Sequence, residues 1–286
     1  MGESPASSIA DLAVRVAETV AHVRARVELV PQVGLTLGSG LGGVAAALEN
    51  AVSLPTSTLP HWPRSTVPGH EGRLVVGRWA GVPMVALAGR SHRYEGYTLD
   101  RVTFGVRVMM ELGARTMLFT NAVGGLSPHL EPGDLMLATD HVNFIGKRGL
   151  LSPSETVERR SGRRVASYYD PRLRESLCAA ALRAGVRVRL GVLIGGHGPS
   201  YETAAEVRMA AALGADAACM STVHEVTLAA ELGCRVASLS CVTNLATGIS
   251  DRPLTHEEVT VVADRVAGRL RRILDEYLAV EERCGT

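Results

Sequence analysis

Glycines and a serine near the start of the chain form a loop that could bind an anion. The stretch VGLTLGSGLGG, residues 33–43, is a short apolar run followed by glycines spaced as G-x-G-x-x-G, with Ser39 between them. In dinucleotide-binding proteins an acidic residue about 20 positions later binds the ribose. Residues 50–66 contain no acid, and their prolines disfavour a following strand, so the sequence does not support an NAD site. A cradle of backbone N–H groups for another anion remains, as does a tight turn that needs glycine only for its backbone angles.

A second polar stretch, GRSHRYEGY at residues 89–97, follows an apolar run. Arg90, His92 and Tyr94 occupy alternating positions, so an extended backbone would point all three side chains the same way. Arginine offers phosphate a bidentate fork, and histidine adds a donor that can follow the protonation state of the anion. The pattern predicts an anion site at the end of a strand, and a solvated strand edge is the alternative.

Two later turns offer further donors to an anion. The apolar run MLFT leads into Asn121–Gly125, where small residues leave backbone N–H groups uncovered. In MSTVHE, Thr222 and Glu225 have the spacing of a capping box, which predicts the start of a helix. Ser221 would then lie at a helix N-terminus, where the helix dipole favours anions. A capping role alone would also explain Thr222 and Glu225.

Helical and strand patterns alternate along the chain, which predicts an α/β fold. The expected helices cover residues 8–28, 98–113, 171–185, 202–213, 223–232 and 256–281, the last opened by a capping box from Thr255 to Glu258. The expected strands cover residues 33–37, 73–79, 82–89, 116–125, 133–144, 187–195, 215–220 and 235–244. Residues 152–167 show neither pattern and are expected to form an irregular loop. We predict one domain over residues 1–286, with a largely parallel sheet flanked by helices.

Composition narrows the classes of function. The chain has 286 residues, 46% of them hydrophobic, and a net charge of +1, which argues against nucleic acid or an anionic membrane surface as a partner. No apolar run has the length of a membrane span, and the N-terminus lacks the pattern of a secretory signal. The five cysteines contain no C-x-x-C pair, and the nine histidines form no H-E-x-x-H motif. These features predict a reduced, cytoplasmic protein without a metal site.

Taken together, the motifs resemble those of the trimeric purine nucleoside phosphorylases. The similarity runs in family order through LGSGLGG, RSTVPGHEGRL, GRSHRYEGY, TNAVGGL, GDLMLATDHVN, GPSYETAAE, MSTVHEV, VTN and HEEV, and so covers nearly the whole chain. It implies a twisted mixed sheet flanked by helices and active sites near the interfaces of a homotrimer. It also implies a purine nucleoside and inorganic phosphate as substrates, with no further cofactor.

The resemblance implies a role for each matching position. Phosphate would contact Ser39, His70, Arg90, His92, the backbone N–H of Ala122, and Ser221. The nucleoside would contact Tyr94 and Met220 at the ribose, His256 at the 5′-hydroxyl, Tyr201 at the purine face, Cys219 beside the base, and Glu202 and Asn244 at the base edge. The residues nearest the reaction would be Asn244, Glu202 and His92.

These roles are consistent with the chemistry of phosphorolysis. The ribosyl group passes through a cation-like state, which bound phosphate can stabilise before it attacks as the nucleophile. Asn244 would hydrogen-bond N7 of the leaving purine, and Glu202 would accept the N1–H of hypoxanthine or guanine but repel the N1 lone pair of adenine. A methylthioadenosine phosphorylase would carry aspartate in place of Asn244 and a less polar 5′ pocket. A nucleoside-binding protein without catalysis is the alternative from another class.

The sequence departs from the family pattern at several positions. Cys219 stands where relatives carry glycine, so its thiol would crowd the base or redirect the strand. The segment 152–169 is shorter than in relatives, which use this region to lend an aromatic residue to the neighbouring subunit, and Tyr168 and Tyr169 are candidates for that role. His197 falls near the predicted base pocket without an assigned role. These departures suggest an altered sugar or base preference.

Overall fold

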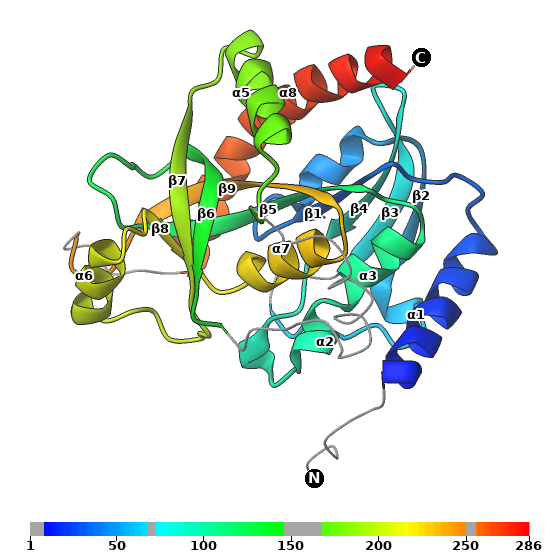
Figure 1. The fold of residues 1–286 in the computed structure, drawn as a ribbon, viewed down its shortest axis with the longest axis horizontal. Helices are drawn as coiled ribbons and strands as arrows, with labels where there is room; N and C mark the ends of the chain where they lie inside the picture. The colour runs from blue at the N-terminus through cyan, green and yellow to red at the C-terminus, as the bar shows by residue number, and fades with distance from the viewer. Residues whose placement is uncertain (1–8, 68–71, 146–166, 250–255, 286) are drawn as a thin grey trace.

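The computed structural model describes residues 9–67, 72–145, 167–249 and 256–285. Its centre is a nine-stranded mixed sheet in the order β2-β3-β4-β1-β5-β8-β7-β6-β9, with β5 also paired to β9 (Figure 1). The strands are β1 (Val33–Leu37), β2 (Glu49–Pro55), β3 (Arg73–Trp79), β4 (Val82–Ala88), β5 (Thr116–Gly125), β6 (Leu135–Asn143), β7 (Val188–Gly195), β8 (Ala217–Cys219) and β9 (Arg235–Leu245). This arrangement confirms the predicted α/β fold with a mixed sheet.

Parallel pairing runs through the middle of the sheet. Strand β1 is parallel to both β4 and β5, and β5 continues the parallel set into β9. The last residues of β5 also pair with β8, whose neighbours β7 and β6 lead back to β9. Five strands therefore close on themselves around the far half of β5. The carboxyl ends of β1, β4 and β5 meet at the same edge of the sheet.

Helices cover both faces of this sheet (Figure 1). Helices α1 (Ile9–Arg24), α3 (Phe104–Glu111) and α7 (Thr222–Glu231) contribute to one core cluster, which includes Val23, Phe104 and Val226. Helices α5 (Pro171–Arg183) and α8 (His256–Gly285) contribute to the cluster on the other face. The short α6 (Ala204–Ala212) packs in a third, smaller cluster beside β8.

The structure corrects three local predictions. Residues 49–55 form strand β2 despite the prolines that disfavoured one, because Pro55 closes an edge strand that pairs only with β3 among the described residues. The first helix ends at Arg24 rather than at residue 28. The helix predicted over 98–113 is divided at Thr103 into α2 (Leu99–Val102) and α3. Most of the predicted loop 152–167, and Thr255 of the predicted capping box, lie outside the described residues.

No helix in the described part of the chain is long and apolar enough to cross a membrane.

Candidate functional site

A pocket of about 120 Å³ lies where the carboxyl ends of β1, β4 and β5 meet the start of α7. Eleven of the residues predicted for phosphate or nucleoside binding line it: Ser39, Arg90, His92, Tyr94, Ala122, Tyr201, Glu202, Cys219, Met220, Ser221 and Asn244. In open α/β sheets this strand edge is the usual place for a ligand. Residues that lie far apart in the sequence, such as Ser39 and Asn244, thus share one cavity.

The glycine loop is held against β5. A Cβ atom on Gly38 would lie 2.8 Å from the Cα of Asn121, so only glycine allows this approach, and the Gly38 N–H donates to Thr120 Oγ1 at 3.2 Å. Gly40 has a φ of +72°, in the left-handed region that favours glycine. The two explanations of this loop are therefore compatible: its glycines serve the turn, and the turn brings Ser39 to the pocket.

Arg90 is the buried cation of the pocket, with an exposed fraction of 6%. Its Nη1 donates to Ser221 Oγ at 3.2 Å, and its Nη2 donates to the Thr120 carbonyl at 2.9 Å. The Glu225 carboxylate lies 3.3 Å from Nη2. The alternative of a solvated strand edge is therefore wrong for Arg90.

Glu225 does not form the predicted capping box with Thr222. Helix α7 begins at Thr222, and the preceding Ser221 makes no side-chain cap hydrogen bond. The Glu225 side chain is 2% exposed and pairs with Arg90 instead. Burial raises the pKa of the Glu225 carboxyl, and the Arg90 guanidinium lowers it. The capping pattern thus predicts the start of the helix correctly but assigns the wrong partner to Glu225.

His92 is fixed by a second carboxylate. Its backbone N–H and its Nδ1 lie 2.6 and 3.2 Å from Glu95 Oε1. Burial raises the pKa of Glu95, but hydrogen bonds from His92 and Thr66 outweigh that effect and lower it to about 2. The imidazole stacks on the Tyr94 ring with centroids 4.8 Å apart. The predicted extended backbone ends at His92, because residues Arg93–Glu95 form a 3₁₀ turn, yet Tyr94 still lines the pocket.

The pocket is also lined by an oriented carboxamide and a carboxylate. Thr243 Oγ1 donates to Asn244 Oδ1 at 2.9 Å, and Asn244 Nδ2 donates to the Leu245 carbonyl at 3.1 Å. Glu202 lies just before α6, and burial raises the pKa of its carboxyl. Tyr201 beside it is 42% exposed, so its ring is available to a flat ligand.

Cys219 continues β8 without disturbing it. The residue pairs in register with Gly195, and its carbonyl accepts the Gly196 N–H at 2.8 Å, so the expected redirection of the strand is wrong. The side chain belongs to the core cluster that includes Tyr169 and Val223. Burial raises the pKa of the thiol to about 11, although backbone N–H groups of the first turn of α7 lower it.

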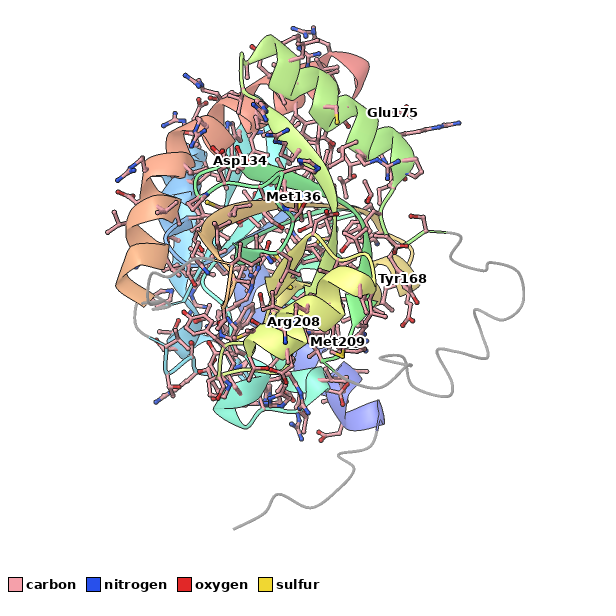
Figure 2. The ribbon with its side chains drawn as sticks, turned by 90° about the vertical axis from the view of Figure 1, so that its left-hand side faces the viewer. Asp134, Met136, Tyr168, Glu175, Arg208 and Met209 are labelled. Atoms are coloured by element: carbon pink, nitrogen blue, oxygen red, sulfur yellow. The ribbon has the colours of Figure 1, made fainter. Side chains whose placement is uncertain are left out.

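The remaining predicted residues lie outside the pocket or outside the description. His70 is not among the described residues, and His256 begins α8 with an undescribed side chain. His197 is exposed, and its Nδ1 lies 3.0 Å from the Gly198 carbonyl. The Tyr169 hydroxyl lies 3.2 Å from His141 Nδ1, and the ring of Tyr168, which is labelled in Figure 2, lies 5.2 Å from the His141 ring.

Seven lining residues were not predicted. They are Asn121, Val123, Gly124, Ala218, Thr243, Ala246 and Val259. Asn121, Val123 and Gly124 belong to β5, in the stretch that the sequence predicted to be a turn with uncovered backbone N–H groups, and the turn prediction is wrong because these residues continue the strand. The apolar residues carry no chemical pattern that could have distinguished them from the core. Within the described residues, no cluster of three or more His, Cys, Asp or Glu side chains could hold a metal ion.

Comparison with known proteins defines the family. A profile of the Phosphorylase superfamily matches residues 32–279. Purine nucleoside phosphorylase 1 of Geobacillus stearothermophilus is 42% identical over 244 residues, which are 85% of this chain and 89% of that protein. A Schistosoma purine nucleoside phosphorylase in complex with hypoxanthine aligns with a TM-score of 0.86 at 31% identity, over 96% of this chain and 99% of that chain. The Schistosoma mansoni enzyme in complex with adenosine aligns with a TM-score of 0.85 at 32% identity, over 92% and 96% of the two chains. The chain therefore belongs to the Phosphorylase superfamily and, within it, to the purine nucleoside phosphorylases.

Proposed function

We propose that the protein cleaves 6-oxopurine nucleosides such as inosine and guanosine with inorganic phosphate, releasing the free base and a pentose 1-phosphate. One observation carries the proposal: a single pocket contains a buried guanidinium hydrogen-bonded to the Ser221 hydroxyl, a carboxamide oriented by Thr243, and the Glu202 carboxylate. The guanidinium suits phosphate, and the carboxamide and carboxylate suit the edge of a purine. The ribose would lie between them, against Tyr94 and Met220.

In this proposal the protein positions the reactants and stabilises charge, without a covalent intermediate. Arg90, His92, Ser39, Ser221 and the backbone N–H of Ala122 hold phosphate beneath the sugar. The anion stabilises the positive charge that develops on the ribosyl group and then forms the new bond to C1′. The electron pair of the broken N-glycosidic bond leaves with the purine, which Asn244 stabilises at N7. His70 and His256 complete the proposed contacts, to phosphate and to the 5′-hydroxyl.

The base preference rests on Glu202. As a carboxylate it accepts the N1–H of hypoxanthine or guanine, whereas adenine presents a lone pair at N1. The Schistosoma mansoni relative has been solved in complex with adenosine, so the preference of this chain for 6-oxopurines over adenine has to be measured. Asn244, in place of aspartate, disfavours the methylthioadenosine alternative. Cys219 lines the pocket and also joins the core cluster, so an altered base or sugar preference stays an alternative within the proposal.

The oligomeric state, the cellular compartment and the absence of a cofactor are proposed from the family resemblance and the sequence. We expect a homotrimer in the cytoplasm, with inorganic phosphate as co-substrate and no other cofactor. Light scattering would then give a mass three times that of the 30.2 kDa chain.

A substrate panel tests the proposed function. We expect phosphate-dependent release of base from inosine and guanosine at least about 100-fold more efficiently than from adenosine or methylthioadenosine, because repulsion at N1 and lost hydrogen bonds each cost a few kcal/mol. Glu202→Gln should reduce kcat/KM for inosine by about 10- to 100-fold and narrow the gap to adenosine. The control is Glu175→Gln, which alters an exposed carboxylate on α5 (Figure 2). It should change neither kcat/KM for inosine nor the gap to adenosine. Equal effects of the two variants, or binding of nucleoside without base release, would contradict the proposal.

A further inference from the structure

His141 on β6 connects two distant parts of the chain through its ring nitrogens. Its Nδ1 lies 3.2 Å from the hydroxyl of Tyr169, shortly before α5, and its Nε2 lies 3.4 Å from Thr227 Oγ1 on α7. Thr227 Oγ1 also donates to the Val223 carbonyl at 2.7 Å, one turn earlier in the helix. These groups form a hydrogen-bond chain that the proposed reaction does not use directly.

The contacts of the chain assign the position of the imidazole proton. Because the Thr227 hydroxyl gives its hydrogen to the Val223 carbonyl, it can only accept from His141, so Nε2 carries the proton. Nδ1 is then an acceptor, and the Tyr169 hydroxyl donates to it. Burial lowers the pKa of His141 and outweighs the opposing effect of the Asp140 carboxylate, which favours the neutral ring that this arrangement needs.

Two tyrosine rings restrict the orientation of the imidazole. The Tyr169 ring, which is 1% exposed, meets it edge-on with centroids 5.7 Å apart. The Tyr168 ring lies at 5.2 Å and is tilted by 31° to it. His141 is therefore held by packing as well as by hydrogen bonds, and it gives α7 a fixed attachment point on β6.

The helix that His141 holds carries two of the groups that contact Arg90. Arg90 Nη1 donates to Ser221 Oγ, and Nη2 lies 3.3 Å from the Glu225 carboxylate. Ser221 immediately precedes α7, and Glu225 is in its first turn. A shift or rotation of α7 would therefore move the guanidinium. Apolar contacts have no preferred direction, whereas a satisfied polar network specifies one arrangement of the helix.

We propose that His141 is a positioning residue for the phosphate site, because it binds α7 at Thr227 and thereby fixes the place of Ser221 and Glu225 around Arg90. The inference rests on the proposed function and adds to it a support that touches neither substrate. Breaking the hydrogen-bond chain at either end should then weaken the binding of phosphate more than that of the nucleoside.

The test alters the chain at Thr227. Thr227→Val keeps the size of the side chain and removes the hydroxyl, whereas Thr227→Ser keeps the hydroxyl. The control is Thr103→Val, since Thr103 is 1% exposed and its Oγ1 also donates to a carbonyl four residues earlier, that of Leu99 at 2.7 Å, with no histidine partner among the described residues. Tyr169→Phe breaks the other end of the chain and leaves α7 unaltered.

Four quantities are measured for each variant: the KM for phosphate, the KM for inosine at saturating phosphate, the shift in Tm that phosphate alone produces, and stability in urea. For Thr227→Val we expect the KM for phosphate to rise about 10-fold, as a misplaced guanidinium binds the anion less well, and the phosphate-induced Tm shift to shrink. The KM for inosine should stay within about twofold, because none of the proposed nucleoside contacts lies on α7. Thr227→Ser and Thr103→Val should leave the KM for phosphate within about twofold of the wild type.

Tyr169→Phe should raise the KM for phosphate as well. Combined with Thr227→Val it should add less than its effect alone, both on this KM and on stability in urea, because the chain is already broken. Additive effects of the two substitutions would show that no such chain exists.

Several results would overturn the inference. Thr103→Val might raise the KM for phosphate as much as Thr227→Val, Thr227→Ser might behave like Thr227→Val, or Thr227→Val might lose stability while binding phosphate normally. If Thr227→Val does not fold, Tyr169→Phe decides: an unchanged KM and Tm shift for phosphate in that variant would refute the positioning role. The phosphate-induced Tm shift needs no nucleoside, so it tests His141 even if the wild type cleaves none, and the two proposals can fail separately.

Discussion

The polar side chains of the pocket are oriented by immediate neighbours. Thr243 donates to Asn244 Oδ1, which fixes the end of the carboxamide that is left for a ligand. Glu95 does the same for His92 by occupying its Nδ1. A pre-oriented group needs no reorganisation when the substrate arrives, which is the main electrostatic advantage of an enzyme site over water. The family resemblance pointed to Asn244 and the residue spacing to His92, and both line the pocket, but Thr243 and Glu95 act through contacts that only the folded chain defines.

The raised pKa of Glu202 predicts a pH-dependent base preference. Burial disfavours the charged form of this carboxyl and so raises its pKa, and the group therefore protonates at a higher pH than an ordinary glutamic acid. The carboxylate accepts from inosine N1–H, whereas the neutral acid donates to adenosine N1. The ratio of kcat/KM for inosine to that for adenosine should therefore fall as the pH is lowered through this pKa. Glu202→Gln should give a flat ratio, and a flat ratio in the wild type would show that Glu202 does not contact N1.

At the scale of elements, α7 connects the proposed phosphate site to the core. Its first turn follows Ser221, and Glu225 on the same helix supports Arg90, which follows β4. The remainder of the helix is buried against β5 and β9. Packing holds this buried helix in place. It can therefore position Glu225 against Arg90 even though both charged groups lose their water on folding.

Removing Glu225 should therefore destabilise the protein and weaken phosphate binding together. Glu225→Ala leaves the Arg90 guanidinium buried without its carboxylate, which costs about 3–5 kcal/mol of unfolding free energy. The exposed pair Arg183–Glu276 provides a control, since its side chains are 42% and 43% exposed and Glu276→Ala should cost at most about 1 kcal/mol. Urea unfolding and the KM for phosphate would be measured for both. Similar losses in the two variants would show that the buried pair has no special role.

The regular elements could be predicted because their causes are local. The alternation of apolar runs located β1, β3, β4 and β5 closely, as their burial is encoded in consecutive residues. Strand β2 was missed because an edge strand tolerates proline and carries mostly exposed side chains, so it lacks that pattern. Glu225 was misassigned for the opposite reason: its spacing from Thr222 is a local pattern, but its partner Arg90 is distant in the sequence.

At the scale of the whole molecule, the pocket is lined by residues from distant parts of the chain. The proposed phosphate contacts come from β1, β4, β5 and α7, whereas the proposed base contacts come from residues around β9 and α6, near the first turns of α8. Val259 on α8 lines the pocket, and Asp275 on the same helix accepts from Trp79 Nε1 of β3 at 2.6 Å. No sequence pattern predicted Val259, because its place in the cavity depends on how a long helix crosses the sheet.

The most direct test of the account is whether phosphate is the nucleophile. Purified protein would be incubated with inosine at equal concentrations in phosphate and in a phosphate-free buffer, and hypoxanthine release followed together with the ³¹P NMR spectrum. The account predicts release only with phosphate, with one equivalent of pentose 1-phosphate formed for each base. Release of hypoxanthine at the same rate without phosphate, with free pentose as the product, would contradict it, because water rather than the anion beside Arg90 would then attack C1′.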